Sequence, residues 1–548
     1  MEKRVTQAQK QSLIAGGLTS SAGIFLTKAL GIFYMSPFQQ IVGEANTVYY
    51  GKAYNLYDYV LTISLAGIPM AIAALVSKYL AREDYKSVLL IRKLSTAVLA
   101  FFGCIMASLV ILCSPWISRL VMSSQISPED LKKMQNVFVI ISLAVFAVPL
   151  LSSYRGFIQG FKEFKAYAFS QVLEQVARIA FLLGMGAFVV YVLDMDRIWG
   201  VYVAVGSTSF SAVVAIIHMV FFAGKRAREV KDLANSQTVG SPERRELLKE
   251  LFMFALPYLA VTFLGTATTM TNFALFEKAM DNRHLETIEE IKLLDSMLSL
   301  TANKITSIPQ VLAPGFSAAI IPFVTVAFEQ KDRTKIQQLA REAVETVLYI
   351  GLPLVFFLVL IPQELYYVLF GKSSSWQLGG EVTRWCALLG FFGMISPVFN
   401  NLMLALRQRK TSLMILAAGF ILNFVITIPF ITLFGYSGAV TSSSTASLFI
   451  ITIDLYIMRK RFGITFHETL GRIAKMSLGI GAMALALQAC RMLISITTIS
   501  SRLVSLAVLA GYGLVGMLVY LGVTQLLGLP QQILHTGIWR LFKRLIKR

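Results

Sequence analysis

Long apolar runs of about 20 residues recur along nearly the whole chain and are separated by short polar connections. Each run is continuous rather than alternating with a period of two, which favours membrane-spanning helices and excludes a barrel of strands. We count fourteen spans, near residues 12–35, 57–78, 94–113, 135–154, 166–192, 198–223, 250–275, 296–327, 343–362, 382–405, 411–434, 437–458, 473–490 and 503–527. The pattern predicts an all-α polytopic membrane protein.

The composition agrees with this prediction. The chain has 548 residues, of which 56% are hydrophobic and 15% are charged, and its mean hydropathy is +0.67. A soluble protein would carry about a quarter charged residues. The four cysteines and four histidines are dispersed, so we expect neither a disulfide framework nor a metal site.

The distribution of basic residues predicts the orientation of the spans. In a soluble protein the net charge of +20 would suggest a nucleic-acid partner. With the N-terminus in the cytoplasm, however, 35 of the 50 Lys and Arg residues fall in inside segments and 12 in outside connections. The other three, Lys28, Arg178 and Lys304, lie within spans. The positive-inside rule then places both termini in the cytoplasm, and we expect no nucleic-acid partner.

A repeat is visible when the sequence is shifted on itself by 248 residues. The shift superposes Asn55 on Asn303, Gly67 on Gly315, Asp84 on Asp332 and Pro149 on Pro397. We therefore predict two related six-helix lobes of parallel topology, residues 1–232 and 233–462, around a central cavity. This is the architecture of alternating-access transporters. A duplicated membrane scaffold is the alternative.

Two further segments follow the repeat. Residues 463–529 hold the two added helices. In residues 530–548, apolar side chains recur at helical spacing among five basic residues. That pattern predicts an amphipathic helix on the anionic cytoplasmic leaflet.

Signs of enzyme chemistry are missing from the sequence. There is no phosphate-binding loop motif, and the outside connections are too short to fold a catalytic domain. We interpret the acidic segment 277–290, which includes Glu277 and Asp281, as a solvated outer loop. The sequence thus predicts neither an enzyme nor a bound cofactor, and it leaves coupling to the membrane potential or to an ion open.

Charged residues inside spans are costly and are candidates for function. Lys304 precedes Pro309, Pro314 and Gly315, so its helix is expected to bend and to expose carbonyl groups toward a cavity. Lys28 is expected at a similar depth in the first lobe. The alternative for both lysines is snorkelling to the outer interface.

Glu174 and Arg178 lie in the middle of the fifth span at a spacing of four residues. This spacing allows an ion pair within one helix, which could be structural or could line a cavity. Together the deep positions hold three cations and one anion, which favours an anionic substrate.

The segment 152–183 contains Tyr154-Arg155-Gly156, Gln159-Gly160 and Ser170-Gln171-x-x-Glu174-Gln175-x-x-Arg178. It resembles the helix 4–5 signature of the MurJ/YtgP/SpoVB-type flippases of the multidrug/oligosaccharidyl-lipid/polysaccharide (MOP) superfamily. The family's helix-1 pattern matches Thr27–Gly31 with Lys28 in place of Arg. Its helix-8 pattern matches Ala302-Asn303-Lys304 and Pro309, with Asn for Asp and Lys for Arg. No counterpart of the family's helix-2 arginine is present.

The resemblance implies translocation of lipid II, an undecaprenyl-diphosphate-linked peptidoglycan precursor, across the bacterial cytoplasmic membrane for cell wall synthesis. Together with the charged positions inside the spans, it predicts a substrate site that includes Lys28, Glu174, Arg178, Asn303 and Lys304. Hinge positions would be Gly31, Pro309, Pro314 and Gly315. Cell wall synthesis enzymes would be partners. The alternatives are another lipid-linked glycan (capsule, teichoic acid or spore cortex), a multidrug/cation antiporter, or a scaffold.

Overall fold

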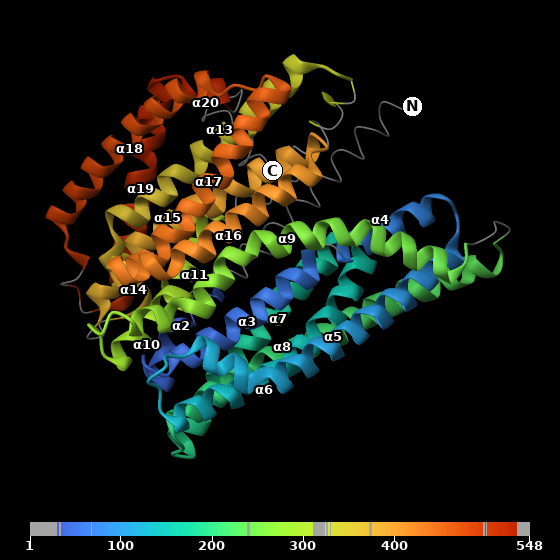
Figure 1. The fold of residues 1–548 in the computed structure, drawn as a ribbon, viewed down its shortest axis with the longest axis horizontal. Coiled ribbons are helices and arrows are strands. Elements are labelled where there is room, and N and C mark those ends of the chain that lie inside the picture. The colour runs from blue at the N-terminus through green and yellow to red at the C-terminus, as the bar shows by residue number, and fades with distance from the viewer. Residues whose placement is uncertain are drawn as a thin grey trace. The chain divides into compact units, whose positions relative to one another are not determined.

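The computed structural model describes residues 30–31, 34–66, 68–161, 163–237, 242–310, 324, 327–328, 330–371, 375–496, 499 and 501–533. All regular structure in these residues is helical (Figure 1). Ten of the helices are long and apolar enough to cross a membrane. They coincide with the predicted third to sixth and ninth to fourteenth spans, so the chain is a multi-pass helical membrane protein. Lys28, Pro314, Gly315 and residues 534–548 lie outside the described residues.

The chain divides into two compact units, Met1–Ser299 and Leu300–Arg548. The first contains α2 (Met35–Val42), α3 (Thr47–Ala66), α4 (Ile68–Ala81), α5 (Tyr85–Val121), α6 (Pro128–Gly160), α7 (Phe164–Ala187), a π-helix (Phe188–Val192), α8 (Arg197–Asn235), α9 (Arg244–Asp281) and α10 (Ile288–Ser296). The predicted second span falls on α3 and α4, and Gly67 between them lies outside the described residues.

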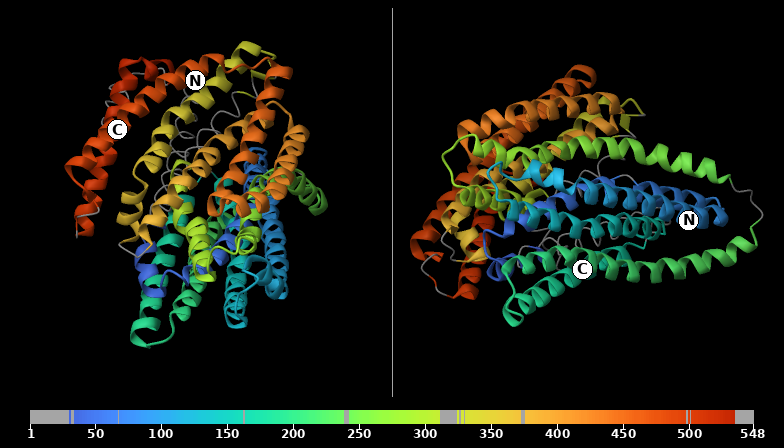
Figure 2. Two further views of the ribbon diagram at one scale, coloured as in Figure 1. Left: turned by 60° about the vertical axis from the view of Figure 1, so that its left-hand side comes forward. Right: turned by 60° about the horizontal axis from the view of Figure 1, so that its bottom comes forward.

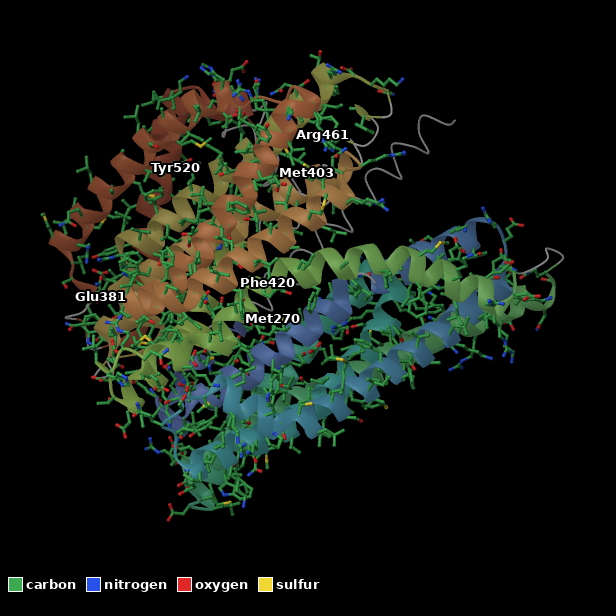
Figure 3. The ribbon with its side chains drawn as sticks, in the orientation of Figure 1. Met270, Glu381, Met403, Phe420, Arg461 and Tyr520 are labelled. Atoms are coloured by element: carbon green, nitrogen blue, oxygen red, sulfur yellow. The ribbon has the colours of Figure 1, made fainter. Side chains whose placement is uncertain are left out.

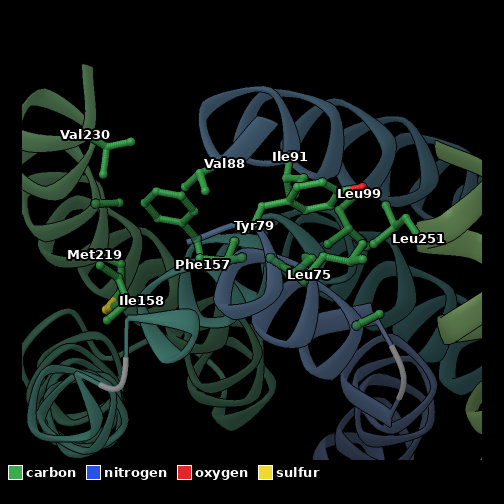
Figure 4. Close-up of a cluster of buried hydrophobic side chains, with 14 of the residues drawn as sticks. Leu75, Tyr79, Val88, Ile91, Leu99, Phe157, Ile158, Met219, Val230 and Leu251 are labelled. Atoms are coloured by element: carbon green, nitrogen blue, oxygen red, sulfur yellow. The ribbon is translucent and has the colours of Figure 1, made fainter. Parts of the chain in front are cut away.

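The first unit is built on side-by-side helix pairs. α5 packs along α6, and α7 packs along α8, as two further orientations show (Figure 2). Buried apolar side chains from α4, α5, α6, α8 and α9 form a common core, including Leu75, Leu99, Phe157, Met219 and Leu251 (Figure 4). Since α9 contributes to this core, it is an integral part of the unit.

The second unit contains α11 (Ala302–Gln310), α13 (Arg333–Leu360), α14 (Pro362–Phe370), α15 (Trp376–Ala405), α16 (Arg409–Phe434), α17 (Tyr436–Phe462), α18 (His467–Leu493), α19 (Arg502–Leu526) and α20 (Leu529–Ile533). α15 packs against α11, α13 and α17, and α18 pairs with α19. The hydroxyl of Tyr520, the α19 residue labelled in Figure 3, donates a hydrogen bond to the Tyr349 carbonyl on α13. This bond ties the last pair of helices to the rest of the unit.

One turn is repeated in both units at the spacing of the sequence repeat. Glu83 and Lys331 each have a φ of 57°, and each precedes an aspartate that caps the next helix. Asp84 accepts a hydrogen bond from the Ser87 N–H at the start of α5, and Asp332 accepts one from the Lys335 N–H at the start of α13. The matching geometry supports the repeat. The lobe boundary at residues 232/233 stays a prediction.

Two glycines of the helix 4–5 signature allow α6 to lie close to α4. A Cβ atom on Gly156 would come within 2.8 Å of the Pro69 carbonyl oxygen, and one on Gly160 within 2.5 Å of the Val76 side chain. The Ser77 hydroxyl also donates a hydrogen bond to the Gly160 carbonyl. These two positions of the signature therefore serve helix packing.

We expect Gly160→Ala to destabilise the protein by about 1–3 kcal/mol, because the β-branched Val76 cannot move away from the added methyl group. Thermal unfolding of the purified variant measures this. The control is Gly184→Ala on α7, where nothing lies within 4 Å of the added atom. There the change should be neutral or stabilising, since alanine favours a helix. Equal Tm values for the two variants would contradict the packing role.

Candidate functional site

A buried cluster of three charged side chains lies between α6 and α7 in the first unit. Glu174 accepts a hydrogen bond from Arg178 Nη2 on one carboxylate oxygen and from Arg155 Nη2 on the other, each at 2.9 Å. The exposed fractions of Arg155, Glu174 and Arg178 are 5%, 9% and 5%. Because two guanidinium groups share one carboxylate, the cluster has a net charge of +1.

Neutral partners complete the surroundings of the two arginines. Arg155 donates hydrogen bonds from Nε and Nη2 to the Ser170 hydroxyl, at 3.2 and 3.0 Å. Arg178 donates to Ser211 and to the Tyr57 hydroxyl, each at 3.5 Å. The guanidinium of Arg178 also lies 5.7 Å from the centroid of the Tyr57 ring. These partners are neutral, so among the hydrogen bonds and ion pairs of the two arginines with described residues only Glu174 supplies a negative charge.

The sequence predicted only part of this cluster. The pair Glu174–Arg178 is present, at the spacing that the sequence indicated. Arg155, however, was counted with an inside connection, and the structure buries it in α6. The only signal that could have found it was its place in the Tyr-Arg-Gly element of the helix 4–5 signature.

A row of tyrosines on α3 extends from the charged cluster. Tyr50, Tyr54 and Tyr57 follow one another on one side of the helix, with 5.9 Å between successive ring centroids. The Tyr50 hydroxyl shares a hydrogen bond of 3.0 Å with the Tyr34 hydroxyl. Such a row offers aromatic faces and hydroxyl groups next to a cation.

The remaining predicted site residues that the structure describes belong to different units. Gly31 is buried in the first unit, with the Gln175 amide 3.5 Å from the position of an added Cβ. Lys304 lies half-buried and Asn303 exposed on α11 of the second unit, and Pro309 is buried in the same helix. A π-helix, Met297–Thr301, immediately precedes α11. Such irregular turns are frequent at functional sites.

The interpretation of residues 277–290 as a solvated loop is wrong at its first residues. Glu277 is fully buried at the end of α9, and Asp281 is 7% exposed. Lys52, which falls in the first outside connection of the predicted topology, is fully buried on α3 and forms ion pairs with Glu277 and with Asp295 on α10. Glu277 and Asp295 lie more than 200 positions from Lys52 in the sequence, so their pairing and burial could not be predicted from local spacing.

Residues 282–287 form a turn that is exposed or half-buried, and α10 begins at Ile288. Thr287 and Glu290 form a reciprocal capping box at the start of α10. The hydrogen bonds that the Glu290 carboxylate accepts from the Thr287 N–H and hydroxyl lower the pKa of Glu290 below its ordinary value. Among the described residues, no group of three or more His, Cys, Asp or Glu side chains is arranged to hold a metal ion.

Comparison with protein families gives two matches. The model of the family described as "Polysaccharide biosynthesis protein" matches residues 13–328. The MatE model matches residues 300–428.

Individual relatives agree with these matches. The chain is 24% identical to the lipid II flippase MurJ of Bacillus subtilis (strain 168), over 97% of this chain and 98% of that protein. Among solved structures, it is similar to the lipid II flippase MurJ in an inward closed conformation, with a TM-score of 0.66, 14% identity, and coverage of 95% of this chain and 100% of the other. An inward-facing multidrug resistance MATE family transporter of the MOP superfamily gives a TM-score of 0.62 at 15% identity, covering 80% and 94%. The fold is thus that of MATE and MurJ transporters, and the resemblance stated from the sequence is confirmed.

Proposed function

Because the chain belongs to the family described as "Polysaccharide biosynthesis protein", we propose that it is a flippase for lipid II. It carries this undecaprenyl-diphosphate-linked precursor from the inner to the outer leaflet of the bacterial cytoplasmic membrane by alternating access. The similarity to MurJ over 97% of the chain supports the proposal. In this proposal the chain has fourteen spans in two six-helix lobes plus two added helices, with both termini cytoplasmic.

The observation that carries the proposal is the buried, net positive cluster of Arg155, Glu174 and Arg178. An unbalanced cation in a dry environment is costly unless an anion approaches it. A diphosphate is such an anion, and arginine binds it with two parallel hydrogen bonds. Lys28 and Lys304 would add point charges, and Asn303 would add an amide. Gly31, Pro309, Pro314 and Gly315 would bend during transport.

A second candidate substrate is another undecaprenyl-linked glycan. The family description names polysaccharide biosynthesis in general, and a site for diphosphate would serve any such lipid. A multidrug/cation transporter is less favoured, because the cluster on α6 and α7 is positive. Cell wall synthesis enzymes would receive the lipid on the outer side.

Lipid II exposed on the surface of depleted cells tests the proposal. An impermeant reagent that cleaves or labels lipid II is applied to cells depleted of this protein and to cells that express it again. We expect exposed lipid II to fall on depletion and to return with the wild-type chain. The control measures total lipid II, which should not fall. Unchanged exposure in cells without another flippase would exclude lipid II and favour the second candidate.

A further inference from the structure

Three charged groups that have no part in the proposed substrate site converge in the first unit. Lys52 comes from α3, Glu277 from α9 and Asp295 from α10. Lys52 Nζ lies 2.5 Å from Asp295 Oδ2 and 3.5 Å from Glu277 Oε1. The exposed fractions of the three residues are 0%, 0% and 4%. This cluster, the α3–α9–α10 triad, is therefore sealed from water.

The triad holds more negative than positive charge. Two carboxylates face one ammonium group, so with all three ionised the net charge is −1. Burying an unbalanced charge costs several kcal/mol even after relaxation of the surroundings. When two carboxyl groups share a site, binding one proton removes this excess.

The contacts within the triad also favour the binding of one proton. Besides facing the two carboxylates, the Lys52 ammonium donates a hydrogen bond to the Phe273 carbonyl, at 3.4 Å. Glu277 Oε1 and Asp295 Oδ2 both lie within 3.5 Å of the same ammonium nitrogen, so the two carboxyl groups are neighbours. One proton bound by this pair would leave a single negative charge to balance the single ammonium group.

The neighbouring charged groups already have partners. The Ser123 N–H donates to Glu277 Oε2 at 2.6 Å. Asp281 accepts hydrogen bonds from the Ser123 hydroxyl and the Ser124 N–H, which follow α5. Lys292 on α10 pairs with Asp130 on α6, at 2.7 Å, and lies 5.9 Å from the Tyr49 ring. No described cation other than Lys52 is therefore paired with the triad carboxylates.

We propose that Glu277 and Asp295 form a proton-binding site that holds one shared proton while α10 is packed on α3. The site lies at the end of α9 predicted to face the outside. Its ligand is the proton itself, which would make it a coupling ion for a transporter of this fold.

The site can respond to movement because α10 is attached to α3 by few polar contacts. Besides the triad, the Ser296 hydroxyl on α10 bonds to the Thr47 hydroxyl on α3. If α10 separates from α3, Asp295 leaves Glu277 and Lys52, each carboxyl group meets water, and the proton is released at neutral pH. Binding the proton thus favours the closed arrangement, and only this difference in affinity between the two states allows coupling.

The stability of the purified protein at different pH values tests proton binding without any substrate. A carboxyl group that stays protonated in the folded protein, but ionises in the unfolded chain, stabilises the fold less as pH rises. We expect the Tm of the wild-type protein to fall by a few degrees between about pH 6 and pH 9. In Glu277→Gln, which replaces the shared proton by a permanent amide, this fall should be lost.

Two further variants make the test specific. Asp295→Asn should flatten the same profile, and it serves if Glu277→Gln fails to fold. Glu289→Gln makes the same chemical change at an exposed position on α10 and should retain the wild-type profile. Parallel profiles for the wild type, Glu277→Gln and Asp295→Asn would overturn the proposal. Because the measurement involves no lipid, its result tests proton binding independently of the proposed flippase function.

Discussion

Replacing Glu174 by Gln is expected to cost about 3–5 kcal/mol of stability, the largest loss that we anticipate for a single substitution in this protein. The carboxylate is the one acidic partner that Arg155 and Arg178 are seen to share. Without it two guanidinium groups remain close together and buried, each at 5% exposure. The yield of monodisperse protein in detergent and its Tm measure the effect.

Two companion variants identify the cause of that loss. Glu174→Asp keeps the charge on a shorter side chain and should recover part of the stability. Glu129→Gln is the control, because Glu129 is 79% exposed beside Lys133 and an exposed pair contributes about 0–1 kcal/mol. A Glu174→Gln protein as stable as the wild type would show that the cluster has another counter-charge.

Replacing Lys304 by Ala is expected to reduce lipid II exposure at the cell surface on the order of tenfold or more, since a hydrogen bond to a charged group contributes about 1.5–3 kcal/mol. Lys304 is half-buried in the helix that follows a π-helical turn. Exposed lipid II is measured in depleted cells that express the variant at wild-type level.

Matched substitutions separate charge from structure at this position. Lys304→Arg keeps the positive charge, as the related family pattern does, and should retain transport. Lys335→Ala, at an exposed position near the start of α13, should behave as the wild type. Full activity of Lys304→Ala would support a snorkelling role for this lysine and would remove it from the substrate site.

The fold was accessible from the sequence because the bilayer imposes long apolar runs. Ten runs are found as helices at the expected places. The π-helix before α11 was not predicted, since it does not change the average hydropathy of its run. The repeat superposed Asp84 on Asp332, and the structure gives both residues the same capping role.

Local spacing explains which site residues could be found. Glu174 and Arg178 are neighbours on one helix, so their pairing follows from their positions in the sequence. Arg155 and Lys52 were assigned to connections because each lies near the end of an apolar run. Their burial depends on acidic partners supplied by other helices. Contacts of that kind are set by tertiary packing, which hydropathy does not record.

The packing of α9 has a consequence for producing the protein as two separate chains. The sequence repeat suggests dividing the chain between residues 232 and 243, but α9 would then belong to the second fragment. The first fragment would keep Lys52 and Lys78 while losing Glu277 and Glu250, their respective partners. It would also lose the contribution of Leu251 to the shared core. Neither fragment should accumulate without the other, so co-expression would make their survival mutually dependent, as in an obligate heterodimer.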